Sequence, residues 1–529
     1  MRRTRLKTTL GVSGIALLLS ACGSPKQPTP IEGSATSAPA LIGSPASPNT
    51  FDGFAGEHIF MAPAGKSTMH ADGYNSDVHQ VSGPLGINPQ INSRRASQFG
   101  NGMCATITFN QQGQLVALCA SMAGFRIELI APRTLESLAR FDLPGRPSSF
   151  QALINLDPSI MMTDTSGGAY YYLDDKDRVV LADSQQRVVR IAQRQQSNGE
   201  WELYLENSWD LSGDVPNDCQ DWGNWFPSGE CDPITAVMPD SNGLIWWVTR
   251  MGRVGTLNPD TGRVKDTRFE GEEIQNGFSV SSEAVYIVTD HATYAMDTDA
   301  YGTPKVLWRE TYDRGSGKKV GSINQGSGTT PTLIGDRYIT VTDNADEQIN
   351  LLVYRREPHF NGERLICTVP LFEKGASATD NSMVGWGRSI IIENNFGYQN
   401  AYQQKDWSVI QGGISRIDIR EDESGCDVVW SSTEKAPSVV PKLSTENGLA
   451  YFYTFEEQAG EKDVVWYLMA LDAETGKTAF KIRTGAGKNF DNNWAPITLG
   501  PDGTAYVGSL KGLLAIWDEE PEQLEVTAN

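Results

Sequence analysis

The stretch WAPITLGPDGTAYVGS, residues 494–509, decides the fold. It reads as a strand, a tight turn around Asp502-Gly503, and a second strand rich in β-branched and aromatic residues. Two more stretches repeat this order around an Asn-Gly turn: DPITAVMPDSNGLIWWVT at 232–249 and PSVVPKLSTENGLAYFYT at 437–454. Looser copies begin near residues 104, 170, 278, 330 and 382. The hairpin therefore recurs along most of the chain, at intervals of roughly 45 to 66 residues.

Each hairpin is followed by a second strand pair, often joined by a Thr-Gly turn. The clearest examples are GTLNPDTGRV at 255–264 and ALDAETGKTAFKI at 470–482. Four strands per repeat at this period indicate an all-β protein, a single β-propeller of four-stranded antiparallel blades over residues 101–529. The repeats give eight blades; seven or six blades with insertions also fit the spacing. Residues 51–100 precede the repeats and are interpreted as an N-terminal extension or cap.

ALDAETGKTAFKI resembles the repeat of the pyrroloquinoline-quinone-type propellers, which are eight-bladed. That superfamily includes quinoprotein alcohol dehydrogenases and also a lipoprotein scaffold subunit of the outer-membrane barrel assembly machinery. The resemblance covers residues 100–518 and implies an architecture, whereas its functions diverge. The chain has no Cys-Cys pair and no Cys-x-x-Cys-His motif, which argues against pyrroloquinoline quinone or haem as a cofactor.

The N-terminus has the pattern of an export signal. Residues 1–21 carry a basic start and an apolar run from Leu10 to Leu19, too short to span a bilayer. The run ends in Leu19-Ser20-Ala21-Cys22, which resembles the lipobox of bacterial lipoproteins and implies that Cys22 becomes the lipidated first residue. Gly23 follows, which by the same resemblance favours the outer membrane over the cytoplasmic membrane. Residues 22–50 are rich in Pro, Ser and Gly and are expected to form a flexible spacer.

Charge and cysteine content agree with export. The net charge of −21 excludes nucleic acid as a partner, and the only expected membrane contact is through the lipid anchor. Cys22 leaves six further cysteines, an even number that favours disulfides in an exported chain. Their spacing predicts the pairs Cys104–Cys119, Cys219–Cys231 and Cys367–Cys426. Cys104 and Cys119 lie symmetrically about a hairpin turn at Gln111-Gln112.

Acidic and amide residues follow second strands or enter new blades in several repeats. In a propeller, those loops lie on one face and surround one mouth of the channel. Hard cations prefer such oxygen ligands, so calcium is the cofactor that this mouth would hold. The run NGFSVSSEAVYIVTD at 276–290 resembles a blade of the gluconolactonase-like and paraoxonase-like propellers, which place calcium there. The predicted metal ligands are Asp290, Asp343, Asp346, Glu393 and Asn394.

The same face is expected to carry a ligand wall. Trp222 and Trp225 lie in the loop between Cys219 and Cys231, and His291 and Asn493 lie in neighbouring mouth loops. Outside the repeats, His70, Asp72 and Asp77 could bind a metal or act as an acid/base pair, or could be a satisfied surface loop. The leading functional hypothesis is a lipid-anchored envelope module that binds a small-molecule ligand or another envelope protein. The alternatives are a calcium-assisted hydrolase or lactonase and a quinoprotein oxidoreductase.

Overall fold

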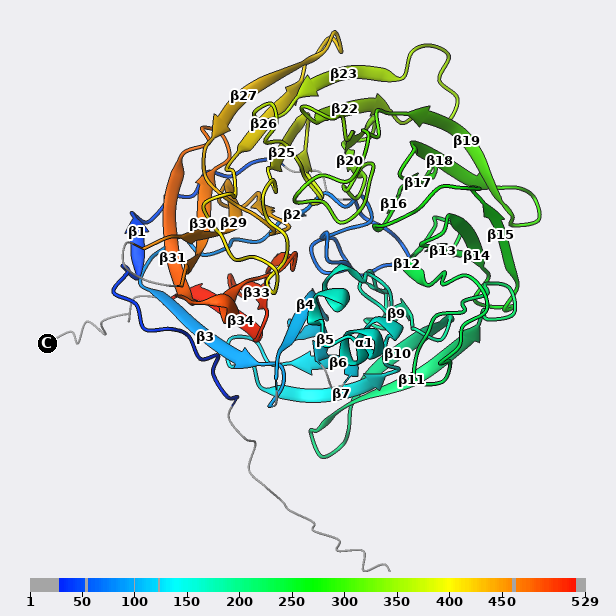
Figure 1. The fold of residues 1–529 in the computed structure, drawn as a ribbon, viewed down its shortest axis with the longest axis horizontal. Coiled ribbons are helices and arrows are strands. Elements are labelled where there is room, and N and C mark those ends of the chain that lie inside the picture. The colour runs from blue at the N-terminus through cyan, green and yellow to red at the C-terminus, as the bar shows by residue number, and fades with distance from the viewer. Residues whose placement is uncertain (1–27, 53–55, 99, 122–123, 459–462, 520–529) are drawn as a thin grey trace, which may run out of the picture.

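Eight sheets surround a central channel, and together they form one β-propeller (Figure 1). The structure, a computed structural model, describes residues 28–52, 56–98, 100–121, 124–458 and 463–519. Each sheet contains one blade of four antiparallel strands whose first strand lines the channel, and in all but the last blade these four strands follow one another in the chain. The prediction of an all-β, eight-bladed propeller is confirmed.

The first four blades occupy the chain from residue 102 to residue 311. Their strands are β4 (Gly102–Phe109), β5 (Leu115–Ser121), β6 (Gly124–Ile130) and β7 (Ser137–Leu143) in blade 1; β8 (Tyr172–Leu173), β9 (Val179–Ala182), β10 (Arg187–Gln195) and β11 (Trp201–Asp210) in blade 2; β12 (Ile234–Pro239), β13 (Ile245–Thr249), β14 (Arg253–Leu257) and β15 (Val264–Arg268) in blade 3; and β16 (Ser279–Val280), β17 (Val285–Val288), β18 (Ala292–Thr298) and β19 (Pro304–Thr311) in blade 4.

The remaining blades follow in the same way. Their strands are β20 (Thr332–Ile334), β21 (Tyr338–Thr342), β22 (Asn350–Arg355) and β23 (Leu365–Pro370) in blade 5; β24 (Val384–Trp386), β25 (Ser389–Glu393), β26 (Ile414–Ile419) and β27 (Cys426–Ser432) in blade 6; β28 (Lys442–Ser444), β29 (Leu449–Glu456), β30 (Val465–Asp472) and β31 (Thr478–Ala486) in blade 7; and β32 (Ile497–Leu499), β33 (Ala505–Ser509) and β34 (Gly512–Asp518) in blade 8. Three short helices interrupt the repeats: α1 (Pro147–Ile154), η1 (Pro158–Thr163) and η2 (Lys488–Phe490).

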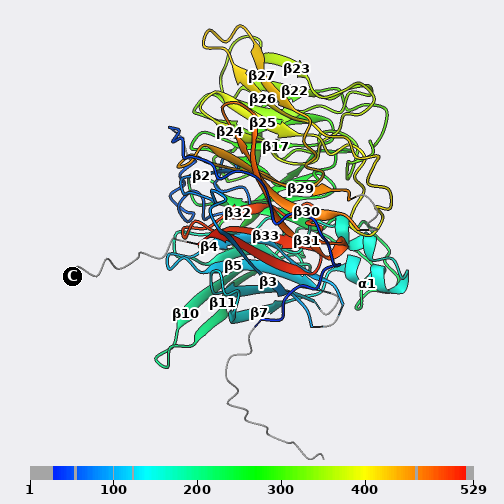
Figure 2. The ribbon, with the colours of Figure 1, turned by 90° about the vertical axis from the view of Figure 1, so that its left-hand side faces the viewer.

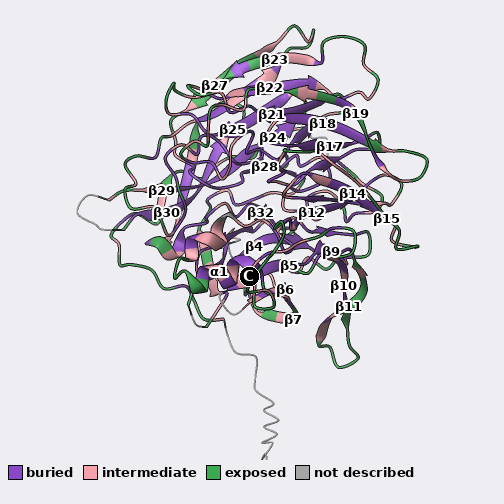
Figure 3. Cartoon of the chain, turned by 45° about the vertical axis from the view of Figure 1, so that its right-hand side comes forward, coloured by how far each residue is buried: buried purple, intermediate pink, exposed green. Residues whose placement is uncertain are grey.

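The second strand of each blade is buried along nearly its whole length. β13 reads IWWVT, and all five of its residues are buried. Because neighbouring blades cover both faces of each sheet, this strand is apolar at consecutive positions and does not alternate. Trp246 and Trp247 therefore pack on opposite sides of blade 3, and both are fully buried. Figure 3 shows the inner strands as buried, while exposed residues gather on outer strands, loops and the α1 region.

Residues before the repeats complete the last two blades. β3 (Pro89–Arg95) pairs with β34 as the fourth strand of blade 8, and β1 (Leu41–Gly43) pairs with β31 at the outer edge of blade 7. The propeller thus begins before residue 101, and part of the stretch expected to be a flexible spacer is packed against blade 7. Blade 8 needs this addition because residues 497–518 supply only three strands and leave the edge of β34 unpaired.

One N-terminal segment, residues 66–79, closes an end of the channel and is called the channel strap below. Its backbone carbonyls accept hydrogen bonds from the inner-strand regions of six blades. The pairs are Lys66 with Phe109, Ser67 with Leu173, Gly73 with Val280, Tyr74 with Leu333, Ser76 with Gly385 and Asp77 with Leu443. Within the strap, β2 (Val78–His79) also runs parallel to β28. In Figure 2 the strap region, beside the label β2, lies on the side of the disc opposite α1.

Three disulfides join the predicted pairs of cysteines. Cys104 and Cys119 are direct partners across β4 and β5, and Cys367 joins Cys426 between the outer strands of blades 5 and 6. Cys219 and Cys231 close a loop between β11 and β12. Disulfides of this number indicate an extracytoplasmic protein. Among the residues that the structure describes, no helix has the length and apolarity needed to cross a membrane. Cys22 and the signal sequence lie outside the described residues.

Candidate functional site

The loops that join second to third strands, and those that link one blade to the next, lie on one side of the propeller. This side is called the mouth face, and the opposite side, with the channel strap, is the strap face. Asp290, Asp343, Asp346 and Asn394 lie in second-to-third-strand loops, and Glu393 is the last residue of β25. The element order thus places all five predicted metal ligands toward the mouth face.

Asp290 is neutralised by a cation from its own chain. The Arg314 guanidinium donates a hydrogen bond to its carboxylate, and His291 Nδ1 lies 2.8 Å from the other carboxylate oxygen. The backbone N–H of Glu273 also donates to Asp290 Oδ1. His291, predicted as a ligand-binding residue, is therefore a partner of Asp290.

Asp343 and Asp346 lie in the same loop of blade 5, near Lys319. The Lys319 ammonium donates to the backbone carbonyl of Ala345, and both carboxylates act on its charge. Burial raises the pKa of Asp343, and hydrogen bonds from Asn350 oppose that rise. Hydrogen bonds from Ser316 hold the pKa of Asp346 below its ordinary value. Lys319 is thus a positive charge close enough to interact with both acids, although it pairs with neither.

Glu393 and Asn394 serve the interior of blade 6. Glu393 is fully buried, accepts a hydrogen bond of 2.6 Å from the Asn381 amide, and has a pKa that burial raises to about 8. Asn394 donates to the carbonyls of Ala376 and Gly412 and pins two loop segments together. A neutral carboxyl and an amide used in this way are structural groups.

The five predicted metal ligands therefore share a face but do not form a coordination sphere. In the described part of the chain, the ligand atoms of three metal-binding side chains converge only at Cys104, Cys119 and Glu128, and those cysteines form a disulfide. Carboxylates crowded at a channel mouth need positive charge or donors. Arg314 and Lys319 come from the connection between β19 and β20, which the sequence analysis did not examine for counter-ions.

His70 and Asp77 belong to a buried ionic network in the strap. Lys442 Nζ donates to Asp77 Oδ1 at 2.6 Å, and both side chains are fully buried. His70 Nδ1 lies 3.2 Å from the Asp77 carboxylate and 2.9 Å from Ser382 Oγ. Burial alone would raise the pKa of Asp77, but the charges of Lys442 and His70 hold it below its usual range. The network ties the strap to blades 6 and 7.

Ser382, His70 and Asp77 do not form a catalytic triad. A triad needs one imidazole nitrogen on the nucleophile and the other on the acid. Here the same nitrogen, Nδ1, faces both groups, and His70 Nε2 has no hydrogen-bond partner among the described residues. Asp72 accepts from Ser76 at 2.6 Å and holds the strap turn. His70, Asp72 and Asp77 are all buried, so the interpretation as a satisfied surface loop is wrong.

A cavity of about 170 Å³ opens at the mouth face and is called the mouth cavity. Its walls come from β4 to β6 of blade 1, from the α1–η1 insertion, and from the long insertion between β25 and β26. Most of the wall is apolar: Met103, Leu118, Phe125, Met161, Met162 and Leu510. Its polar groups include Asn101, Arg146, Asp164, Tyr402 and Asn493. A volume of this size suits a small molecule of benzene-like dimensions.

The polar groups of the mouth cavity are held in place by neighbouring groups. Tyr402 Oη accepts from the Asn101 amide at 2.7 Å, and Asn493 Oδ1 accepts from the backbone N–H of Ala401. Arg146 stacks over the Phe125 ring at 4.1 Å and donates to the Asp164 carbonyl. Burial opposes ionisation of Asp164, but the Arg146 charge and hydrogen bonds from serines hold its pKa low. Of the predicted ligand-binding residues, Asn493 lines this cavity.

Trp222 and Trp225 do not line the mouth cavity. Both rings pack edge-on against Phe150 of α1, with centroids 4.5 and 4.8 Å away. They support the outer side of the insertion that roofs the cavity. Sequence reasoning missed Arg146, Met161 and Met162, because the insertion falls between repeats and has no motif. The insertion could have been recognised from the long stretch of sequence between β7 and β8, residues 144–171.

Comparisons with known proteins show little beyond the fold. No family model matches the chain. An uncharacterized protein of Archaeoglobus fulgidus is 26% identical over 318 residues, which is 54% of this chain. This chain spans 61% of that archaeal protein's length.

Solved structures that resemble the chain are propellers of low identity. The WD40 repeats of RRP9 match at 8% identity and a TM-score of 0.39, over 76% of this chain and 99% of theirs. Sqt1 of Saccharomyces cerevisiae matches at 8% identity and a TM-score of 0.35, over 68% of this chain and 97% of Sqt1. A chain of the mitotic checkpoint complex matches at 8% identity and a TM-score of 0.33, over 65% of this chain and 87% of that chain. At these values the three structures carry no functional argument.

Proposed function

We propose that this protein is a lipid-anchored binding module of the cell envelope whose ligand occupies the mouth cavity. The observation that carries the proposal is the cavity itself, a mostly apolar space with fixed polar groups, built by two insertions over blade 1. Ligand sites are commonly concave and apolar with a few oriented polar groups. The channel behind it is crossed by the strap.

The ligand that suits this site is a small, mainly apolar molecule with one polar group. Methionine side chains adapt to apolar ligands of differing shape, and three of them line the wall. The Tyr402 hydroxyl and the Asn493 amide are placed to bond a polar group at one end. A calcium-assisted hydrolase is not favoured, because the predicted ligands bond to groups of this chain such as Arg314, Asn350 and Asn381 and do not converge.

The proposed membrane location and non-enzymatic role are supported by the sequence. The lipobox-like end at Cys22 supports a lipid anchor, and Gly23 supports the outer membrane. The resemblance of residues 470–482 to pyrroloquinoline-quinone-type repeats, together with eight blades, supports a role like that of the non-enzymatic propellers of that superfamily. An envelope protein remains a second kind of partner for this module.

The test is to fill the cavity. Ala105 lines it on β4, so Ala105→Phe should occupy the space and exclude the ligand. Small molecules extracted from natively purified protein should be identified by mass spectrometry and then used in thermal-shift titrations. We expect the wild type to retain a stoichiometric small molecule and Ala105→Phe to lose it. Thr433→Phe adds the same ring at an exposed position just after β27, outside the mouth cavity, and should retain the molecule. Equal retention by wild type and Ala105→Phe would contradict the proposal.

A further inference from the structure

An exposed apolar patch covers part of the mouth face. It consists of two neighbouring groups, Leu153, Ile154 and Leu156 at the end of α1, and Trp222, Trp225 and Phe226 in the disulfide loop, and is called the aromatic patch. Phe226 is 92% exposed, Leu156 86% and Trp222 62%. Phe150, buried beneath Trp222 and Trp225, belongs to the same helix as Leu153 and Ile154, so the disulfide loop packs on α1. Exposed apolar side chains gathered on neighbouring segments mark interaction sites.

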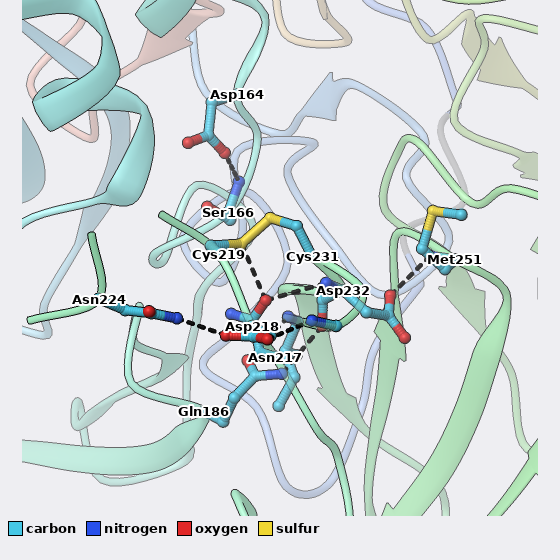
Figure 4. The surroundings of a disulfide bond; sticks show 12 residues. Asp164, Ser166, Gln186, Asn217, Asp218, Cys219, Asn224, Cys231, Asp232 and Met251 are labelled. Carbon is cyan, nitrogen blue, oxygen red and sulfur yellow. Dashed lines mark hydrogen bonds between the residues drawn. A yellow bond between two sulfur atoms is a disulfide. The ribbon is translucent and has the colours of Figure 1, made fainter. Parts of the chain in front are cut away.

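The disulfide loop holds these rings outward by bonding its polar groups internally. Figure 4 shows Asp218 beside the Cys219–Cys231 disulfide, facing Asn224. The Asp218 carboxylate accepts hydrogen bonds from Asn224 and from the backbone N–H groups of Ser228 and Gly229. These bonds hold the pKa of Asp218 below its ordinary value. A loop fixed in this way presents its aromatic side chains with little entropy to lose on binding.

The N-terminal end of the described chain reaches the propeller on the same face. Arg95 donates its backbone N–H to the Thr29 carbonyl at 2.8 Å, and Arg95 pairs with Gly512 at the start of β34. β34 is the third strand of blade 8, and every third strand starts at the mouth face because the loop before it lies there. The Asn489 amide, in η2, also donates to the Glu32 carbonyl at 2.8 Å. The first described residues therefore lie at the rim of blade 8, on the mouth face.

The tether between the anchor and the propeller is short. Cys22 and Thr29 are seven residues apart, and a fully extended chain of that length spans at most about 25 Å. A lipid on Cys22 would thus hold the rim of blade 8, and the mouth face with it, close to the bilayer. The patch is then within reach of the same surface.

The charges around the aromatic patch indicate which kind of lipid surface it could contact. Asp157, Asp214 and Asp221 lie in the same two insertions, and the chain carries a net charge of −21. Anionic lipid would be repelled, whereas tryptophan, phenylalanine and leucine side chains favour the headgroup region of a bilayer. The contact is therefore apolar and independent of salt.

We propose that the mouth face rests on the membrane that holds Cys22, with the aromatic patch inserted into the headgroup region of a zwitterionic phospholipid surface. This orientation rests on the lipid anchor of the proposed function. It places the mouth cavity next to the bilayer, from which a small apolar ligand could enter.

The experiment uses the lipidated protein in phosphatidylcholine vesicles whose acyl chains carry bromine, which quenches tryptophan at short range. In the described part of the chain, Trp222 and Trp225 are the two exposed tryptophans. We expect quenching of the wild type that falls by at least half in Trp222→Ser/Trp225→Ser, with unchanged co-sedimentation. Phe226→Ser/Leu156→Ser keeps both tryptophans and should also reduce their quenching. Raising salt from 0.1 to 1 M should leave the signal unchanged.

The control places a tryptophan on the other face. Tyr301 is 76% exposed in the turn between β18 and β19, a third-to-fourth-strand turn on the strap face. Tyr301→Trp in the Trp222→Ser/Trp225→Ser background should give no added quenching. Protein that co-sediments with vesicles while Trp222 and Trp225 remain unquenched would overturn the orientation and assign the patch to a protein partner. Protein that fails to co-sediment would instead refute the anchor.

Discussion

Glu393 is a buried carboxylic acid whose protonation is coupled to folding. Its pKa is raised from 4.5 to about 8 by burial at the end of β25. The native chain therefore keeps a proton that the unfolded chain releases between these values. The stabilisation from this group is complete below the lower value and is lost as the pH rises through the higher one. Asp380 and Asp491, with pKa values of about 7, act in the same direction.

Glu393→Gln should flatten this pH dependence. The glutamine oxygen can still accept the bond from Asn381, but no proton is exchanged on unfolding. We expect the free energy of unfolding to fall less between about pH 5 and pH 8 than in the wild type, since each pKa unit is worth about 1.4 kcal/mol. Urea titrations at several pH values measure it. Asp346→Asn is the control, because the pKa of Asp346 is lowered and its loss should not flatten the fall in stability above pH 5. If the free energy of unfolding falls equally steeply with pH in the wild type and in Glu393→Gln, the coupling is refuted.

At the level of elements, the three disulfides act in different places. Cys367–Cys426 joins the outer strands of two blades and closes 59 residues of chain, whereas Cys219–Cys231 closes a 12-residue loop outside the sheets. The loop lies outside the blades, so its bond fixes the aromatic patch more than the propeller.

Cys367→Ala/Cys426→Ala should lower the free energy of unfolding by about 2–4 kcal/mol, since the bond restricts a long stretch of the unfolded chain. Cys219→Ala/Cys231→Ala should cost less and should reduce vesicle quenching of Trp222 and Trp225. Urea unfolding and the brominated-vesicle assay compare the two variants. The reverse ranking, with the loop disulfide the more stabilising, would show that the loop is part of the core.

The repeating hairpins could be predicted from the sequence because each carries its own turn residues and β-branched strands. β3 could not: PQINSRR has no alternation, since this edge strand has only one neighbour and part of it is exposed to solvent. The strap has no strand pattern because it bonds through backbone carbonyls, which any sequence offers. Two cysteine pairs followed from hairpin symmetry and loop length, and Cys367–Cys426 was the pair that remained.

The site could be predicted only in part. The alternating strand direction of a propeller placed the acidic residues on one face, but the spacing of the repeats gave no information on which cations would lie beside them. Arg314 and Lys319 come from a connection without repeat character, and so do the methionines of the mouth cavity. Contacts made by insertions depend on the assembled propeller, because residues such as Asn101 and Tyr402 meet across 301 positions of sequence.

For the whole molecule, the contacts of the described N-terminal residues begin after the proposed anchor position, Cys22. The described chain contacts the propeller from Thr29 onward, through Arg95 and Ser93, and Ile31 is buried against blades 7 and 8. Cys22 precedes all of these contacts. Loss of a lipid at Cys22 should therefore change the location of the protein and leave its stability unaltered.

Cys22→Ala should move the protein from the membrane fraction to the soluble extracytoplasmic fraction, because the aromatic patch alone supplies only a small apolar area for membrane binding. The melting temperature of the released protein should equal that of detergent-solubilised wild type, since none of the strap, β1 or β3 contacts is removed. Fractionation with immunoblotting measures the first result and circular dichroism the second. A lysine substitution on the opposite face, Tyr301→Lys, should leave the protein in the membrane fraction. If Cys22→Ala stays membrane-bound, the lipobox interpretation is wrong; if it is released but melts early, residues before Thr29 also stabilise the propeller.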